Sequence, residues 1–363
     1  MTAKRNLESV STAVGSAART APVRESRTAE SRPTLVAATA GREGRTLTDE
    51  RNPGIPLDLD AVLSLHVNRS AVERRAATIP MRRTVKKEWQ AAWLLRAITL
   101  IDLTTLAGDD TPGNVRRLCA KARRPLRDDL ERALGVGHLH IQVGAVCVYH
   151  ALVPTAVEAL AGTSIPVAAV SAGFPAGLSP LQQRIDEIRA SVAAGAREID
   201  IVITRGHVLT GDWHALYDEV RAFREACGDA HLKAILGTGE LATLTNVARA
   251  SIVAMQAGAD FIKTSTGKES VNATLPFALV MARMIREYQD QTGFAVGFKP
   301  AGGIRSAKNV LEYMYLMKDE LGDQWLEPSL FRIGASALLT DIERQLEHFV
   351  TGRYAAAHRM PMP

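Results

Sequence analysis

The chain has 363 residues, 46% of them hydrophobic, and a formal net charge of +5 at pH 7. The apolar content is typical of a globular protein, and no stretch approaches the roughly 20 apolar residues of a membrane span, so we expect no membrane partner. The three cysteines are scattered without a metal-ligand cluster, which predicts a cytoplasmic chain with neither disulfides nor a zinc site. The small positive excess predicts no specific nucleic-acid partner.

The N-terminal region is rich in Ala, Arg, Ser, Thr and Glu, and no Phe, Tyr, Trp or Ile precedes Ile55. This composition predicts a disordered arm over residues 1–55. A targeting presequence is the alternative interpretation, but Glu8, Glu25, Glu30 and Glu43 break the acid-poor pattern of such signals. Apolar residues from Leu57 onward predict a helical extension over residues 56–96.

After about residue 97, short apolar stretches alternate with helical patterns. Eight of the short stretches are predicted β-strands, and most are apolar throughout, as expected for strands buried on both faces of a parallel sheet. The predicted strands cover residues 97–102, 145–149, 167–171, 198–203, 232–236, 261–264, 295–299 and 331–334.

Helix signals lie between these strands. The sequence Ser179-Pro180-Leu181-Gln182 has the pattern of a capping box and predicts a helix start. Asp212 predicts another start, and the apolar stripe from Trp213 to Cys227 predicts the buried face of that helix, with Gly228 as its stop.

This alternation predicts an α/β fold, a (β/α)₈ TIM barrel over residues 97–350, followed by a C-terminal tail over residues 351–363. A doubly wound open sheet is the alternative. No GxGxxG turn follows the first predicted strand, which counts against a dinucleotide-binding domain. In a barrel, polar residues at the C-terminal ends of the strands meet and form the active site.

Two lysines, Lys263 and Lys299, end the sixth and seventh predicted strands. Burying an isolated ammonium group is expensive, so a buried lysine tends to lower its pKa. A lysine near its ordinary pKa of about 10.4 needs roughly 4–5 kcal/mol of destabilisation of its charged form to titrate near pH 7. A neighbouring cation supplies part of that, and the neutral amine then attacks carbonyl carbons. The pair therefore predicts covalent amine catalysis.

Asp200, in the fourth predicted strand, is the candidate proton shuttle beside the lysine pair. Further strand-end candidates are Asp102, Thr104, Thr266 and Lys268. Two other charged residues receive structural interpretations. Glu198 is interpreted as pointing to the opposite face from Asp200, and Lys233 as the ion-pair partner of a neighbouring carboxylate.

Glycines follow the seventh and eighth predicted strands, where TIM barrels commonly bind phosphate through backbone N–H groups. They occur in Gly302-Gly303 and in Gly334-Ala335-Ser336. A glycine pair alone usually makes a turn, but two such exits at neighbouring strands predict a phosphate site.

Four segments carry a resemblance to a known family. They begin at Ile101, Phe261, Val296 and Phe331 and include both lysines and both glycine motifs. Together they resemble the deoxyribose-phosphate aldolases, most closely the longer, animal-type branch, from about residue 85 to the C-terminus. The resemblance implies a metal-independent class I aldolase with no cofactor that reversibly cleaves 2-deoxy-D-ribose 5-phosphate to acetaldehyde and D-glyceraldehyde 3-phosphate, in deoxyribonucleoside catabolism.

The resemblance also implies individual roles. Lys263 would be the Schiff-base lysine, Lys299 the lysine that tunes it, and Asp200 the proton relay. The substrate site would contain Asp102, Thr104, Thr266 and Lys268, and the phosphate site Gly302, Gly303, Gly334 and Ser336. The partners implied are a sugar phosphate and aldehydes, and a homo-oligomer is left open.

The chain departs from the family pattern at two positions. His150 stands where proline is common, and Ala337 stands where many members carry a second serine. We interpret His150 as a surface or loop residue and expect one fewer phosphate hydrogen bond at Ala337. The alternative functions are another Schiff-base sugar-phosphate aldolase or transaldolase, and a non-catalytic sugar-phosphate-binding protein.

Overall fold

Eight parallel strands form one barrel in the computed structural model, which describes residues 50–82 and 85–359. The strand order is β7-β6-β5-β4-β3-β2-β1-β8, and the bridges Phe298↔Phe331 and Ala301↔Gly334 join β7 to β8. This order confirms the TIM barrel over the open sheet. The strands are β1 Ile101–Thr104, β2 Ala145–Tyr149, β3 Val167–Ser171, β4 Glu198–Val202, β5 His231–Ile235, β6 Phe261–Lys263, β7 Gly297–Lys299 and β8 Ile333–Ala335.

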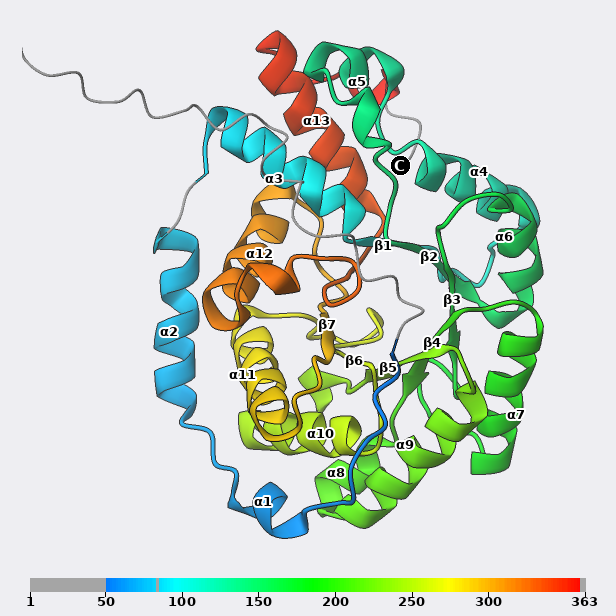
Figure 1. Ribbon diagram of the computed structural model, residues 1–363, viewed down its shortest axis with the longest axis vertical. Helices are drawn as coiled ribbons and strands as arrows, with labels where there is room; N and C mark the ends of the chain where they lie inside the picture. Colours follow the sequence, from blue (N-terminus) through cyan, green and yellow to red (C-terminus); the bar gives the residue numbers. More distant parts are fainter. Residues whose placement is uncertain (1–49, 83–84, 360–363) are drawn as a thin grey trace, which may run out of the picture. The chain divides into compact units, whose positions relative to one another are not determined.

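Helices surround the barrel and cover the outer face of its strands (Figure 1). Asp212 caps α9 by accepting from the Ala215 N–H, and the stripe from Trp213 to Cys227 is buried, as predicted. The surrounding helices are α4 Pro112–Arg123, α5 Asp128–Leu134, α6 Val153–Ala159, α7 Leu181–Ala193, α8 Arg205–Thr210, α9 Trp213–Cys227, α10 Leu244–Gln256, α11 Leu275–Thr292, α12 Ala307–Leu321 and α13 Ala337–Thr351.

Two local predictions were wrong. Residues 97–99 belong to a helix, and the first strand begins only at Ile101, because Ala97 and Ile98 continue the buried face of that helix. The predicted capping box does not form either. Pro180 occupies the N-cap of α7, and no side-chain hydrogen bond caps that helix.

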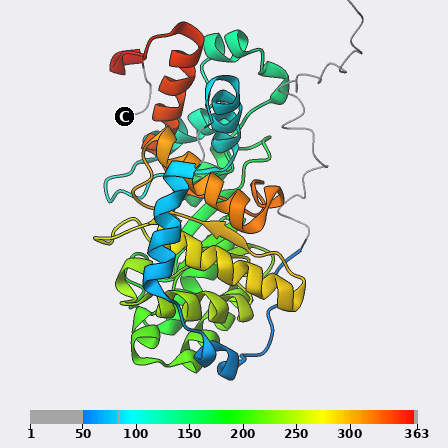
Figure 2. The same cartoon turned by 90° about the vertical axis from the view of Figure 1, so that its left-hand side faces the viewer.

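In the part of the chain that the structure describes, three helices precede the barrel, α1 Leu59–Ser64, α2 Arg69–Arg82 and α3 Lys87–Thr99. Helix α2 packs along α11 and α12, as the two views in Figures 1 and 2 show, while α3 packs on α12 and α13. The helical segment expected over residues 56–96 therefore contains three helices, the last of which continues to Thr99.

Residues 50–55 pack against the amino-terminal end of the barrel. Asn52 is 1% exposed, and its backbone N–H donates to Asp260, the residue directly before β6, at 2.7 Å. Its side-chain oxygen accepts from the Tyr288 hydroxyl at 2.9 Å. The arm predicted to end at 55 thus contributes its last residues to the fold, and the rest of that prediction, residues 1–49, lies outside the described residues.

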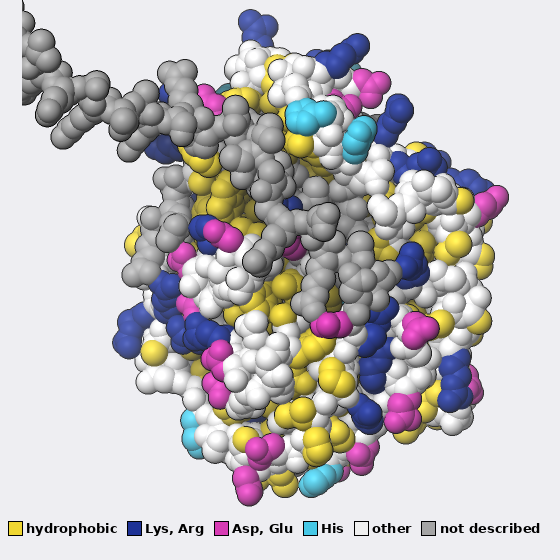
Figure 3. Space-filling view, in the orientation of Figure 1, with side chains coloured by type: hydrophobic (Ala, Val, Ile, Leu, Met, Phe, Trp, Pro, Cys, Tyr) yellow, Lys and Arg dark blue, Asp and Glu magenta, His cyan; other side chains and the backbone are white. Residues whose placement is uncertain are grey.

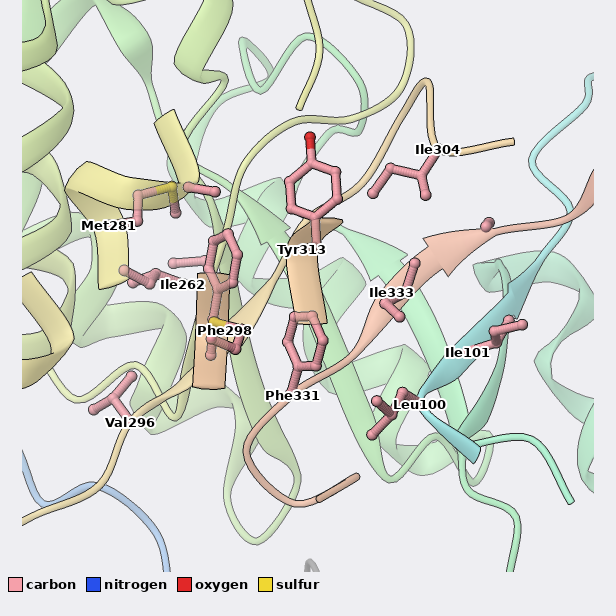
Figure 4. Packing of buried hydrophobic residues seen from close by; sticks show 14 of the residues in the cluster. Leu100, Ile101, Ile262, Met281, Val296, Phe298, Ile304, Tyr313, Phe331 and Ile333 are labelled. Atoms are coloured by element: carbon pink, nitrogen blue, oxygen red, sulfur yellow. The ribbon is translucent and has the colours of Figure 1, made fainter. Parts of the chain in front are cut away.

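Alternating side chains on β6, β7 and β8 divide the outer core from the barrel interior. Ile262, Phe298 and Ile333 point outward to the helices, where Phe298 and Phe331 stack with ring centroids 6.2 Å apart (Figure 4). Because strand side chains alternate, the neighbouring Lys263 and Lys299 point into the barrel. A separate small apolar cluster contains Cys147, Ala168 and Val170 of β2 and β3.

Charged side chains on the surface are mixed. On the face seen in Figure 3, small groups of Lys and Arg side chains have Asp and Glu side chains beside them. Within residues 50–82 and 85–359, no helix is long and apolar enough to cross a membrane.

Candidate active site

The two lysines of the sequence analysis meet inside the barrel. Lys263 and Lys299 are partners in the parallel register of β6 and β7, and they are 3% and 0% exposed. Phe261 lies below Lys263 on the same face of β6 and occupies the space beside Gly297, where any Cβ would come within 2.3 Å of the phenyl ring. The absence of a side chain at Gly297 therefore lets β6 and β7 pack closely under the lysine pair.

Asp200 joins the two lysines. Its Oδ2 atom lies 2.7 Å from Lys263 Nζ and 2.7 Å from Lys299 Nζ, and the carboxyl is fully buried. Burial raises the pKa of Asp200, but Lys233, Lys263 and Lys299 outweigh burial and hold that pKa well below its ordinary value. Asp200 is therefore an ionised carboxylate, which can accept a hydrogen bond from either lysine.

The two lysines differ in pKa although they share this carboxylate. Burial lowers the pKa of Lys263; Asp200 opposes the effect, and Lys299 adds to it, so the net shift is downward. Burial also lowers the pKa of Lys299, but Asp102 and Asp200 raise it by more than burial lowers it, so the net shift is upward. Lys263 is thus the amine that can become neutral, while Lys299 remains a cation beside it.

Asp102 is closed off from solvent inside the barrel. Its side chain is 0% exposed and makes ion pairs with Lys299 at 2.5 Å and Arg332 at 2.6 Å. The half-buried Thr104, two residues further along β1, donates its hydroxyl to the Asp102 carbonyl at 2.7 Å. Of these two predicted substrate residues, only Thr104 has exposed surface.

The interpretation of Glu198 as pointing away from Asp200 is wrong. Residues i and i+2 of a strand share one face, and both carboxylates point into the barrel, where both contact Lys233. Glu198 also pairs with Arg332 at 2.8 Å. Lys233 is paired with carboxylates, as predicted.

Arg332 and Cys147 were missed as interior residues. Arg332 is fully buried and lies two residues before Gly334, on the face of the chain opposite to Ile333. Cys147 in β2 is fully buried, and its charged neighbours include Lys299 and Lys263. The period-two alternation around Ile333 and Val146 could have pointed to both residues.

The loop after β6 brings Thr266 and Lys268 to the C-terminal end of the barrel. Glu269 holds this loop by accepting from the Thr266 N–H at 3.0 Å, while Lys268 is exposed. A Cβ on Gly267 would lie 3.9 Å from the Gly302 Cα, so the loops after β6 and β7 are neighbours.

The predicted phosphate residues divide into two groups. Gly302 and Gly303 have φ values of +81° and +83°, which favour glycine, and they follow β7 at the same end of the barrel. Ser336 is the exposed N-cap of α13, and its side chain makes no capping bond. The Gly334 N–H, in contrast, already donates to Pro300 at 3.0 Å. Gly334 instead allows close packing, since a Cβ there would lie 2.8 Å from the Ala301 Cβ.

The two departures from the family pattern lie outside the lysine cluster. His150 Nδ1 lies 3.1 Å from the Ser191 hydroxyl, so this half-buried residue has a polar contact with α7. Ala337 is the first residue of α13, directly after Ser336.

Two further features concern other kinds of site. A cavity of about 1160 Å³ is lined by residues such as Gly144 and Pro166 that precede the strands, and also by Glu198 and Arg332, so it opens at the amino-terminal end of the barrel, away from the two lysines. Among the described residues, no group of three or more His, Cys, Asp or Glu side chains is placed to hold a metal ion.

Known proteins resemble this chain in sequence. A human protein named "Deoxyribose-phosphate aldolase" is 63% identical over 313 residues, which cover 86% of this chain and 98% of that protein. A Caenorhabditis elegans protein named "Putative deoxyribose-phosphate aldolase" is 50% identical over 248 residues, which cover 68% of this chain and 79% of that protein.

Solved structures share the fold. A putative deoxyribose-phosphate aldolase from Toxoplasma gondii aligns with a TM-score of 0.61 at 20% identity, covering 74% of this chain and 98% of that one. A deoxyribose phosphate aldolase from Aeropyrum pernix, described as having a unique tetrameric structure, aligns with a TM-score of 0.54 at 21% identity, covering 77% and 98%. The model of the DeoC/LacD family aldolases matches residues 96–342, and the chain belongs to this family.

Proposed function

We propose that the protein is a class I aldolase, a carbon–carbon lyase that reversibly cleaves 2-deoxy-D-ribose 5-phosphate into acetaldehyde and D-glyceraldehyde 3-phosphate. The relatives named for this activity support the substrate. The observation that carries the chemistry is a buried Lys263 with a lowered pKa, 2.7 Å from a carboxylate that also binds the cationic Lys299.

In the first step, the neutral amine of Lys263 attacks C1 of the open-chain sugar. Loss of water gives a protonated imine, and this cation withdraws electrons from the neighbouring bonds. The C2–C3 bond then breaks, its electron pair moves into the imine to give an enamine, and the C3 hydroxyl loses its proton. This releases glyceraldehyde 3-phosphate. Protonation of the enamine at C2 and hydrolysis of the resulting imine free acetaldehyde and Lys263.

Asp200 is the proposed route for these protons. Its carboxylate holds hydrogen bonds from Lys263 and Lys299, so it can align a water against the reacting atoms. The pKa of Asp200 lies well below its ordinary value, so Asp200 orients and relays a proton rather than storing one. Lys299 keeps Lys263 neutral before the reaction by its positive charge.

The phosphate group is proposed to bind at the C-terminal end of β7 and β8. Gly302 and Gly303 are proposed to bind it through their backbone N–H groups. The N-terminus of the 15-residue helix α13 carries the hydroxyl of Ser336, which makes no capping bond. Thr104, Thr266 and the exposed Lys268 are proposed to line the path between the phosphate and the lysines. Asp102 is proposed to act on the substrate only through Lys299.

The imine serves as the electron sink, so the reaction as proposed needs no metal or cofactor. Acetaldehyde release from deoxyribose 5-phosphate in the presence of EDTA tests the proposal. We expect full activity with EDTA and little cleavage of other sugar phosphates. Absence of cleavage of deoxyribose 5-phosphate, with cleavage of another sugar phosphate, would assign the site to a different aldol reaction.

We further propose a cytoplasmic setting in deoxyribonucleoside catabolism, which three buried free thiols, Cys119, Cys147 and Cys227, support. A homo-oligomer is also proposed, because the solved structure from Aeropyrum pernix is described as tetrameric. Light scattering on the purified chain measures its mass in solution and tests this directly.

A further inference from the structure

Six buried side chains form a closed ring of alternating charge inside the barrel, five of them from the four strands β1, β4, β5 and β7 and the sixth from Arg332, directly before β8. Around the ring, each carboxylate lies between two cations and each cation between two carboxylates, and Lys233 makes one further contact across the ring, with Asp102 at 3.8 Å. In order, the ring is Asp102, Arg332, Glu198, Lys233, Asp200, Lys299 and back to Asp102.

Arg332 closes the half of the ring nearer the amino-terminal end of the barrel. Its Nη1 atom lies 2.6 Å from Asp102 Oδ1, and its Nη2 atom lies 2.8 Å from Glu198 Oε1. A planar guanidinium bridges two carboxylates in a fixed geometry, and Arg332 is fully buried. Glu198 in turn accepts from Lys233.

The lysines close the other half. Lys233 Nζ lies 3.2 Å from Asp200 Oδ1, and Lys299 Nζ lies 2.7 Å from Asp200 Oδ2 and 2.5 Å from Asp102 Oδ2. Lys263 is attached to this ring only through Asp200, at 2.7 Å. Three carboxylates and three cations balance, so a charged Lys263 would be a fourth cation in a closed, fully buried cluster.

We propose that this neutral ring sets the protonation state of Lys263, and that Arg332, Glu198 and Lys233 are positioning residues for the reaction although they do not touch the substrate. Arg332 pairs with Asp102 and Glu198, which are the second carboxylate partners of Lys299 and Lys233, and so leaves no unbalanced negative charge for a protonated Lys263. The inference deepens the proposed function, on which it rests only in taking Lys263 as the reacting amine.

The electrostatics of the individual groups agree with this account. Burial lowers the pKa of Lys233 and of Arg332, but the carboxylates of the ring raise both above their ordinary values, so both remain cations. Burial raises the pKa of Asp102, but Lys299, Arg332 and Lys233 bring it below its ordinary value. Of the interior lysines, Lys263 is the one with a lowered pKa.

Two further titratable groups near the ring contribute no charge. Cys147 faces the lysines from β2, and burial raises the pKa of its thiol, which keeps it neutral. His231, at the start of β5, has its pKa lowered to about 2, mainly by burial and then by Arg51 and Lys233, so it is neutral as well. The ring is therefore the dominant charged structure that faces Lys263.

The test measures how imine formation depends on pH. Acetaldehyde is the probe, cyanoborohydride traps the imine, and peptide mass analysis reads modification at Lys263. Removing a cation should move the midpoint of this profile to higher pH, and removing a carboxylate should move it to lower pH. We expect Arg332→Met and Lys233→Met to shift it upward and Glu198→Gln downward, each by about one pH unit.

The double variant Glu198→Gln with Arg332→Gln restores the balance and should return the midpoint to near that of the wild type. Lys121→Met is the matched control, because Lys121 is a buried lysine paired with Glu343 at 2.7 Å on helices outside the barrel interior. It should lower stability without moving the midpoint. Unchanged midpoints, or shifts of the same sign for Arg332→Met and Glu198→Gln, would overturn the inference.

A measurement without ring variants covers the case in which these chains do not fold. Lysine side-chain NMR of the wild-type chain, assigned with Lys263→Ala, should show Lys263 titrating below the ordinary lysine range while Lys233 and Lys299 stay protonated. Titration of Lys233 or Lys299 in place of Lys263 would contradict the ring. No trapped imine in the wild type would instead refute the proposed function, so the two failures are distinguishable.

Discussion

Lys263 and Lys299 are register partners on β6 and β7, and their Nζ atoms lie at the same distance, 2.7 Å, from a single oxygen of Asp200. The pKa of Lys263 is nevertheless lowered and that of Lys299 raised, because Lys299 has a second carboxylate, Asp102, at 2.5 Å. One additional ion pair thereby gives two chemically identical side chains opposite pKa shifts.

Replacing Lys299 by leucine should raise the pKa of Lys263, because the cation that opposes protonation is lost. Since only the neutral amine attacks, the pH profile of kcat/KM should move to higher pH by about one to two units. Lys318→Leu, which breaks an ion pair with Asp323 on the surface, is the control and should leave the profile unchanged. An unshifted profile for Lys299→Leu in a folded chain would refute the tuning role.

Asp200→Asn separates proton transfer from imine formation. The amide cannot relay protons as a carboxylate does, so kcat should fall by about 10²–10⁴-fold. The imine should still form, because the Asp200 carboxylate raises the pKa of Lys263 and its removal leaves more of the Lys263 amine neutral. Steady-state turnover and hydride trapping are measured on the same preparation, with circular dichroism as the test of folding. Normal turnover would exclude Asp200 from the relay.

Ser336→Ala tests the phosphate site. Loss of one hydrogen bond to a charged group costs about 1.5–3 kcal/mol, so KM for deoxyribose 5-phosphate should rise roughly tenfold or more. The internal control is 2-deoxyribose without phosphate, whose cleavage should hardly change. If both sugars are affected equally, the hydroxyl of Ser336 does not bind phosphate.

Asn52 tests the structural role of residues 50–55. The residue makes five hydrogen bonds from a buried position, so Asn52→Ala should lower the free energy of unfolding by about 2–4 kcal/mol without changing the pH profile. Asn68→Ala, which removes two exposed hydrogen bonds donated by the Ser70 hydroxyl and the Ala71 N–H, should cost about 1 kcal/mol. Equal losses in urea denaturation would show that residues 50–55 are not part of the stable fold.

Much of the barrel could be predicted because its strands are short apolar runs separated by clear helix signals. The strands at Ala145–Tyr149 and Val167–Ser171 have the predicted bounds. The start of β1 could not be predicted, because the apolar residues Ala97 and Ile98 fit the buried face of a helix as well as a buried strand. In the structure they belong to α3, where both are buried.

Only part of the candidate site could be predicted from the sequence, because the rest depends on tertiary packing. Lys263 and Lys299 stand at strand ends within distinctive motifs, whereas Arg332 and Glu198 meet across the barrel from positions 134 residues apart. Such a pairing depends on the register of all the strands, which no local pattern contains. The error on Glu198 was avoidable, since strand period alone places it on the face of Asp200.

Covalent trapping at Lys263 is the most direct test of the central claim. The chain is incubated with acetaldehyde, reduced with borohydride and mapped by peptide mass analysis, with Lys263→Ala in parallel. We predict a stable adduct on Lys263 together with loss of activity, and neither an adduct nor turnover in Lys263→Ala. An adduct on Lys299, or full activity of Lys263→Ala, would contradict the account.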